Sequence, residues 1–435
     1  MFSPTHSLAR VCSFARSLSF CTYHSVSLAR SLIPSLSQAA CAIASGPVAA
    51  WPTLEPLLIN AGVWKNEGTH SKLDAVYSLS TAVQLGSSLP AGWIYDRYGG
   101  RVAALVGALL AAVGLVIMSV ACFFPAQLSW LMFVGYPLAM LGGGINSYGI
   151  FAFMWLMPDD QNFVASLASG AQSLSDMLAL VAVGLSSCCG VFIGEFFLLL
   201  SVMSVFAGIF CYSIVPSVDV VNSLAAVALS QGESPESCEA FAQSKDGDGF
   251  MAKEFSSVKQ SWVLMKQHAG ANGMLLVFST VYMLSMMYPM QQMYFYYQVL
   301  FNNNDTATKL VNIFAVIYGI GGFVCSLIGG KLCDRLGIQK FTLAVAGCSV
   351  VLSCCLPFAN FTLQIVAQAV MLLGYTLYII IVNRFAMLYA PPHLFGTFSG
   401  VQMTFISVGM LAGMSAVSTS VAFVGATGIS SPKNT

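Results

Sequence analysis

Long apolar runs without charged side chains constrain this chain more than any other feature of its sequence. A helix needs about 20 apolar residues to cross the hydrocarbon core of a bilayer. Nine such runs contain no Asp, Glu, Lys or Arg, and two more contain a single acid each. The sequence therefore predicts an all-α membrane protein with about eleven transmembrane helices. The predicted spans are Ala39–Gly62, Ala75–Tyr95, Val102–Phe124, Leu128–Met157, Phe163–Gly190, Phe196–Val215, Gly270–Leu300, Leu310–Gly330, Phe341–Phe358, Phe361–Asn383 and Leu394–Gly428.

The charge content agrees with this class and excludes others. Charged residues make up 8% of the 435 residues, whereas soluble domains carry roughly 25%. The 17 basic and 17 acidic residues cancel, so no net field attracts nucleic acid. The 13 cysteines lie mostly inside apolar runs, and the five histidines show no metal-binding spacing. We therefore expect no enzymatic activity, no metal and no cofactor. The expected partners are a lipid bilayer and a small-molecule substrate, and the expected oligomeric state is a monomer.

Composition also divides the chain into segments. The first 40 residues contain Arg10, Arg16 and Arg30, many serines and no acid, which is typical of a mitochondrial transit peptide. A disordered tail or an artefact of the gene model would have the same composition. The predicted order is a leader, an N-terminal six-helix bundle, a polar cytoplasmic loop, a C-terminal five-helix bundle and a short tail, at 1–40, 41–215, 216–268, 269–428 and 429–435.

The distribution of basic residues predicts the orientation in the membrane. With the 216–268 loop in the cytoplasm and the leader left out of the count, ten basic residues lie inside and four outside, which agrees with the positive-inside rule. The outer four are Lys65, Lys72, Lys309 and Lys433. The glycosylation sequon at Asn304 then falls outside. This placement favours a plasma or vacuolar membrane, although the leader leaves a mitochondrial membrane open.

A motif that occurs twice is the most informative pattern. "GWIYDRYGGR" follows the second predicted span and "GGKLCDRLGIQK" follows the eighth, 238 residues later from Gly92 to Gly330. Two copies at equivalent places indicate a duplicated fold. The repeated residues are Gly92, Asp96, Arg97, Gly99 and Arg101 in the first copy, and Gly330, Asp334, Arg335, Gly337 and Lys340 in the second.

The residue types in this motif suit a gating loop. Glycine permits a sharp turn or close packing, and an aspartate can cap the next helix at its positive end. The arginine can reach an acid or a carbonyl of a neighbouring helix. Such contacts can hold two halves in one orientation and break in the other, as alternating access requires. A static loop clamp is the alternative interpretation.

The repeated motif resembles the signature loop of the major facilitator superfamily. That resemblance implies two helical bundles around a central cavity that opens alternately to each side. The strings "LGGGINSYGIFAFMWLMP" and "YAPPHLFGTFSGVQMTFISVGML" are similar to those of the system-L-like amino-acid carriers (solute-carrier family 43) and their protist relatives. This implies a carrier of neutral amino acids that works by facilitated diffusion or exchange. Nucleobases or sugars as substrates, and a receptor or scaffold without transport, remain alternatives.

Three departures from the family pattern bear on these expectations. No twelfth helix follows Gly428, the fourth span lacks the arginine of many proton-coupled members, and Ser173 stands where the branch often has an acid. The missing twelfth helix suggests a truncated chain. The missing arginine favours facilitated diffusion or exchange over proton symport.

Ionisable groups inside predicted spans are candidates for substrate binding, because burying them in a membrane is costly. Glu55 lies between Pro52 and Pro56 and can meet a substrate ammonium or carry a proton. A helix-end carboxylate that reaches interfacial water is the alternative. The same two interpretations, substrate binding or a carboxylate that reaches water, apply to Asp176. Arg384 can pair with a substrate carboxylate or extend to the inner surface.

Two polar or glycine-rich clusters complete the candidate site. Gly143, Gly144 and Asn146 in the fourth span permit the close approach of a substrate or of a neighbouring helix. In the seventh span, polar groups share one helical face around an apolar pocket. These are Tyr288, Gln291 and Gln292.

Overall fold

The computed structural model describes residues 51–65, 69–154, 161–175, 177–217, 256–391 and 394–426. The leader, residues 218–255 of the polar loop, the tail and Asp176 lie outside the described residues. Regular structure in the described part is entirely helical, which confirms the all-α fold class.

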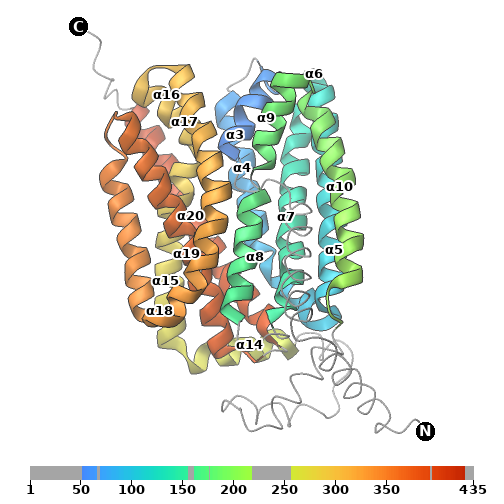
Figure 1. Ribbon diagram of the computed structural model, residues 1–435, viewed down its shortest axis with the longest axis vertical. Helices are drawn as coiled ribbons and strands as arrows, with labels where there is room; N and C mark the ends of the chain where they lie inside the picture. The colour runs from blue at the N-terminus through green and yellow to red at the C-terminus, as the bar shows by residue number, and fades with distance from the viewer. Residues whose placement is uncertain are drawn as a thin grey trace, which may run out of the picture.

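The helices form two groups separated by the polar loop (Figure 1). The first group is α3 (Trp51–Asn60), α4 (Thr69–Gly86), α5 (Ser88–Phe123), α6 (Pro125–Leu128), η1 (Ser129–Leu131), α7 (Met132–Phe151), α8 (Gln161–Ser175), α9 (Leu178–Cys189) and α10 (Ile193–Ile214). The second group is α14 (Ser256–Gln267), α15 (Ala269–Gln291), α16 (Met293–Phe301), α17 (Asn304–Val316), η5 (Ile317–Gly321), α18 (Gly322–Cys355), α19 (Phe361–Tyr389) and α20 (Phe395–Ala426). We refer to them as the N-terminal and C-terminal halves.

Nine helical stretches in the described residues are long and apolar enough to cross a membrane. One of them, Lys72–Phe123, has 52 residues, about twice what a single crossing needs. It contains the predicted spans Ala75–Tyr95 and Val102–Phe124. Of the predicted first span, the structure describes α3 and the turn that follows it. The end of the bundle at α14 is called the inner end, following the predicted orientation, and the end at α16 is the outer end (Figure 1).

One glycine in each half separates two crossings that are otherwise continuous helix. Gly99 breaks α5 with φ 84° and ψ 170°, and Gly337 breaks α18 with φ 74° and ψ 155°. This backbone region is accessible essentially to glycine alone. The two breaks are 238 residues apart, the spacing of the repeated motif, so both copies of the motif place the same backbone turn at the inner end.

Small residues bring helices of the N-terminal half into backbone contact. A Cβ added at Gly107 or Gly114 of α5 would collide with the backbone of α7, at Gly142 and Gly135 respectively. Membrane helices associate closely through such small residues because lipid supplies no hydrophobic drive between them. Gly135 and Gly142 of α7 thus serve helix packing, and Asn146 lies in the same contact against Gly107.

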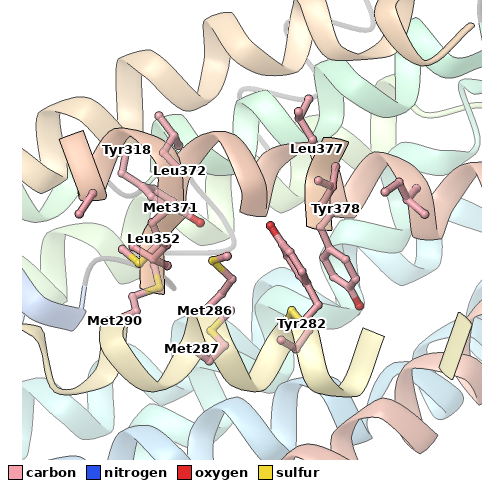
Figure 2. Close-up of a cluster of buried hydrophobic side chains, with 14 of the residues drawn as sticks. Tyr282, Met286, Met287, Met290, Tyr318, Leu352, Met371, Leu372, Leu377 and Tyr378 are labelled. Atoms are coloured by element: carbon pink, nitrogen blue, oxygen red, sulfur yellow. The ribbon is translucent and has the colours of Figure 1, made fainter. Parts of the chain in front are cut away.

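The core of the C-terminal half is built around methionines and tyrosines of α15 (Figure 2). The rings of Tyr282 and Tyr378 stack with their centroids 5.1 Å apart and an interplanar angle of 21°. Met286, Met287 and Met290 are buried in the same cluster. Methionine adapts its shape to irregular gaps, so this core can tolerate small shifts of α15 against α19.

We expect Gly99→Ala and Gly337→Ala each to destabilise the protein, by about 1–3 kcal/mol, because alanine is strained in this backbone region. The measurement is the apparent Tm of the purified protein in detergent. Gly347→Ala is the matched control, since Gly347 lies in helical α18 and a Cβ there would meet no atom within 4 Å. Equal Tm values for all three variants would contradict the strain at the two turns.

Candidate site between the two halves

The two halves meet along two equivalent contacts. In the first, α4 and α5 of the N-terminal half pack on α20. In the second, α8 of the N-terminal half packs on α18. The second crossing of each half therefore faces the fifth crossing of the other, which is the arrangement that duplication of one bundle produces.

The contact between α5 and α20 brings two backbones together at the inner end. A Cβ at Gly92 would fall on the carbonyl of Gly396, and one at Gly400 would fall on the carbonyl of Ser88. Further towards the outer end, the Ser407 hydroxyl donates to the carbonyl of Ala82 at 3.2 Å. We call this contact the inner seam; it leaves no space for side chains between the two helices at its glycines.

Asp96 closes the inner seam by capping α20. Its carboxylate accepts hydrogen bonds from the backbone N–H of Gly396 at 2.9 Å and of Thr397 at 2.6 Å. It also accepts one from the Thr397 hydroxyl at 2.6 Å. The first N–H groups of a helix lack partners within the helix, and its N-terminus favours negative charge. The motif predicted that Asp96 caps the next helix, whereas the capped helix lies 300 residues away in the other half.

The arginines of the first motif copy bind within their own half. Arg101 donates from Nε to the carbonyl of Val215, at the end of α10. The Arg97 guanidinium lies 5.4 Å from the ring centroids of Trp93 and Tyr98. These contacts hold the turn at Gly99 against the N-terminal half, so that Asp96 is presented to α20 as part of a rigid body.

The second motif copy is described in part. Gly330 is buried, and Arg335 and Lys340 are exposed. The backbone at Asp334 is helical, and its side chain lies outside what the structure describes.

At the outer end a second set of contacts joins the halves through α4 and α15. Gln291 donates from Nε2 to the Ser78 hydroxyl at 2.7 Å and to the carbonyl of Asp74 at 3.2 Å. Gln292 donates from Nε2 to a carboxylate oxygen of Asp74 at 2.9 Å. We call this set the outer bridge. Sequence reasoning did not single out Asp74, although it is an acid directly before a charge-free run.

The predicted candidates Gln291 and Gln292 are thus brought together with α4. Tyr288, one turn before them on α15, is half-buried.

Aromatic rings and a buried acid lie next to the outer bridge, on elements of both halves. Trp51 of α3 is completely buried, and its ring lies 5.3 Å from Tyr77 of α4 and 5.0 Å from Tyr136 of α7. The Tyr77 hydroxyl reaches Met287 of α15 at 4.0 Å from its sulfur. Glu55 follows one helical turn after Trp51 and is 2% exposed.

The helix that carries this acid contacts both halves. In the described residues, α3 touches α4 and α9 of its own half and α15, α16 and α17 of the other. Glu55 therefore lies on an element that any movement between the halves displaces. The contacts of Trp51 with Tyr77 and Tyr136 were not predicted from the sequence, because they join three separate helices.

The remaining predicted residues lie elsewhere. Gly144 faces Gln84 of α4, and Arg384 is half-buried near the inner end of α19. Asn304 is exposed at the start of α17, where its side-chain oxygen accepts a hydrogen bond from Gln298 at 3.2 Å. No group of three metal-ligating side chains occurs among the described residues.

A family model and a solved structure match this chain, the first in sequence and the second in fold. A family model described as Major Facilitator Superfamily matches residues 18–414. No curated protein matches the chain. Among solved structures, the proton:xylose symporter XylE of that superfamily, bound to 6-bromo-6-deoxy-D-glucose, aligns with a TM-score of 0.61 at 12% sequence identity. The alignment covers 90% of this chain and 89% of that chain, so the likeness is one of fold.

We expect Asp96→Ala to speed amide hydrogen exchange at the start of α20, on the order of tenfold or more, because hydrogen bonds to a charged group contribute about 1.5–3 kcal/mol. Mass spectrometry of peptides covering residues 394–400 measures this. Asp305→Ala is the control, because Asp305 is an exposed acid in the first turn of α17. Unchanged exchange at 394–400 in Asp96→Ala would show that the cap does not hold α20.

Proposed function

Because the chain belongs to the major facilitator superfamily, we propose that it carries neutral amino acids across its membrane by alternating access. The family and the fold together identify the protein as a multi-pass membrane transporter of small solutes. The substrate class and the mechanism are inferred from the contacts between the halves.

The buried carboxylate of Glu55 is the observation that carries the substrate class. Glu55 is 2% exposed in an apolar helix, and an ionisable side chain inside a membrane bundle is typical of a substrate or ion pathway. Its carboxylate can bind the ammonium of an amino acid. The rings of Trp51 and Tyr77 and the thioether of Met287 pack together within about one helical turn of it, and such groups suit contact with an apolar side chain.

Alternating access is supported by two separate sets of contacts between the halves. The Asp96 cap and the glycines of the inner seam join them at the inner end, and the outer bridge joins them through α4 and α15. Opening the inner end breaks the cap and spares the outer bridge. Opening the outer end does the reverse, so each set stabilises one closed end of the cycle.

Facilitated diffusion or exchange fits the described residues better than proton symport. The α7 helix, Met132–Phe151, carries no acidic or basic side chain in its 20 residues. A plasma or vacuolar membrane is favoured by the exposed sequon at Asn304.

The proposal is tested by the uptake of labelled amino acids, nucleobases and sugars into proteoliposomes that contain the purified protein. We expect saturable uptake of neutral amino acids, and a loss of about 30-fold or more in kcat/KM for Glu55→Gln, since removing a buried charge partner costs about 2–5 kcal/mol. Glu195→Gln is the matched control, because Glu195 is exposed at the start of α10, where it bonds the backbone N–H of Phe192.

Other outcomes separate the alternatives. Uptake by Glu55→Gln at the wild-type rate would remove Glu55 from substrate binding. Saturable uptake of a nucleobase or a sugar alone would overturn the amino-acid assignment. Absence of uptake of every class by correctly folded protein would support a receptor or scaffold.

A further inference from the structure

The α14 helix lies across the inner end of the bundle and is not itself a membrane span (Figure 1). It has 12 residues, and it packs on α20 and on α15, which follows it directly. The first span after it exposes Met274, Val277 and Val281 over more than 60% of their surface. Those residues face lipid, so α14 is positioned at the boundary where the bilayer meets the cytoplasmic side.

The two faces of α14 differ in chemistry. Ser261 and Met265 are buried against the bundle. The opposite face carries Lys259 and Lys266 at its two ends, both exposed, with Trp262 and Val263 between them. Trp262 is 42% exposed and Val263 is 46% exposed. A face with lysines around exposed aromatic and aliphatic residues is typical of helices that lie in the membrane interface.

Two sets of contacts hold α14 in a fixed orientation: hydrogen bonds at its C-terminal end and the stacking of one outward-facing ring on α20. The buried amide of Asn272 donates to the carbonyls of Met265 and His268 at 3.3 and 3.2 Å, which fixes the end of α14. Gln402 of α20 in turn donates to Asn272 at 2.9 Å. The Trp262 ring stacks on Phe405 of α20 with centroids 5.8 Å apart. The lysines are therefore presented on a rigid support.

From this placement we propose that the outward face of α14 binds anionic phospholipid headgroups of the adjacent leaflet. Lys259 and Lys266 contact the lipid phosphates, and Trp262 and Val263 occupy the zone between headgroups and acyl chains. The Lys266 ammonium lies 5.6 Å from the Trp262 ring centroid, so charge and ring lie close enough to engage one lipid. Because α14 packs on α20, the helix that Asp96 caps, bound lipid would contact the element next to α20. This holds for any transported substrate.

Fluorescence quenching by brominated lipids tests this proposal without any transport assay. The full chain is reconstituted in phosphatidylcholine vesicles that contain equal mole fractions of brominated phosphatidylglycerol or brominated phosphatidylcholine. The difference between each protein and its Trp262→Phe derivative isolates the emission of Trp262. We expect stronger quenching by brominated phosphatidylglycerol, with a local enrichment of roughly fivefold for each lysine.

Charge variants decide whether the lysines cause the preference. Lys259→Gln with Lys266→Gln is expected to abolish it. Lys65→Gln with Lys309→Gln removes the same charge from exposed positions at the outer end and is expected to preserve it. Equal quenching by both lipids in the wild type would overturn the proposal and would point to another partner for the lysines, such as the acidic segment at 218–255. A preference that survives loss of both lysines would overturn it as well.

Discussion

The carboxylate of Asp96 at the N-terminus of α20 is the interaction on which the arrangement of the two halves depends. Gly396 and Thr397 are buried, so bulk water does not reach their N–H groups and a partner must come from the protein. Here that partner comes from the other half, and it meets two backbone N–H groups and a hydroxyl together. Both the helix end and the acid would lose their partners if the halves separated at this point.

The glycines around Asp96 make that contact reversible. At Gly92, Gly396 and Gly400 the two helices touch through backbone atoms. Two smooth surfaces can part without the rotamer changes and cavities that separation of an interlocked core would require. The turn at Gly99, with Arg101 bound to α10, keeps the acid fixed to its own half. The inner end therefore combines a specific polar contact, the Asp96 cap, with glycine contacts that can separate at low cost.

The outer bridge has a different character. Its donors are the amides of Gln291 and Gln292, and its acceptors are a carboxylate, a carbonyl and a hydroxyl of α4. Of these three hydrogen bonds one ends on a carboxylate, whereas all three of the Asp96 cap do, and bonds to an ionised acceptor are the stronger ones. The Met-rich core behind α15 lets that helix adjust. The two ends thus differ in strength, which suits a carrier whose resting state is closed towards the inner side.

Sequence reasoning recovered the elements of this fold well and their pairing poorly. Charge-free runs predicted the spans because a bilayer imposes a length and a polarity on each helix separately. The repeated motif predicted equivalent turns, and Gly99 and Gly337 adopt the same backbone conformation. The partner of Asp96 lies 300 residues away, and no periodicity encodes such a distance. For the same reason the contacts of Gln291 and Gln292 with Asp74, and the stacking of Trp51 on Tyr77, do not follow from the sequence.

A reducible bond in place of the Asp96 cap tests most directly whether the contact between Asp96 and α20 must break in each transport cycle. The Asp96 and Thr397 side chains meet at 2.6 Å, so Asp96→Cys combined with Thr397→Cys places two thiols within reach of a disulfide. Thr397→Cys alone, treated with the same oxidant, controls for the native cysteines. The account predicts that oxidation abolishes whatever uptake the reduced double variant retains and that a reductant returns uptake to that level. Full uptake by protein with the cross-link formed would contradict it.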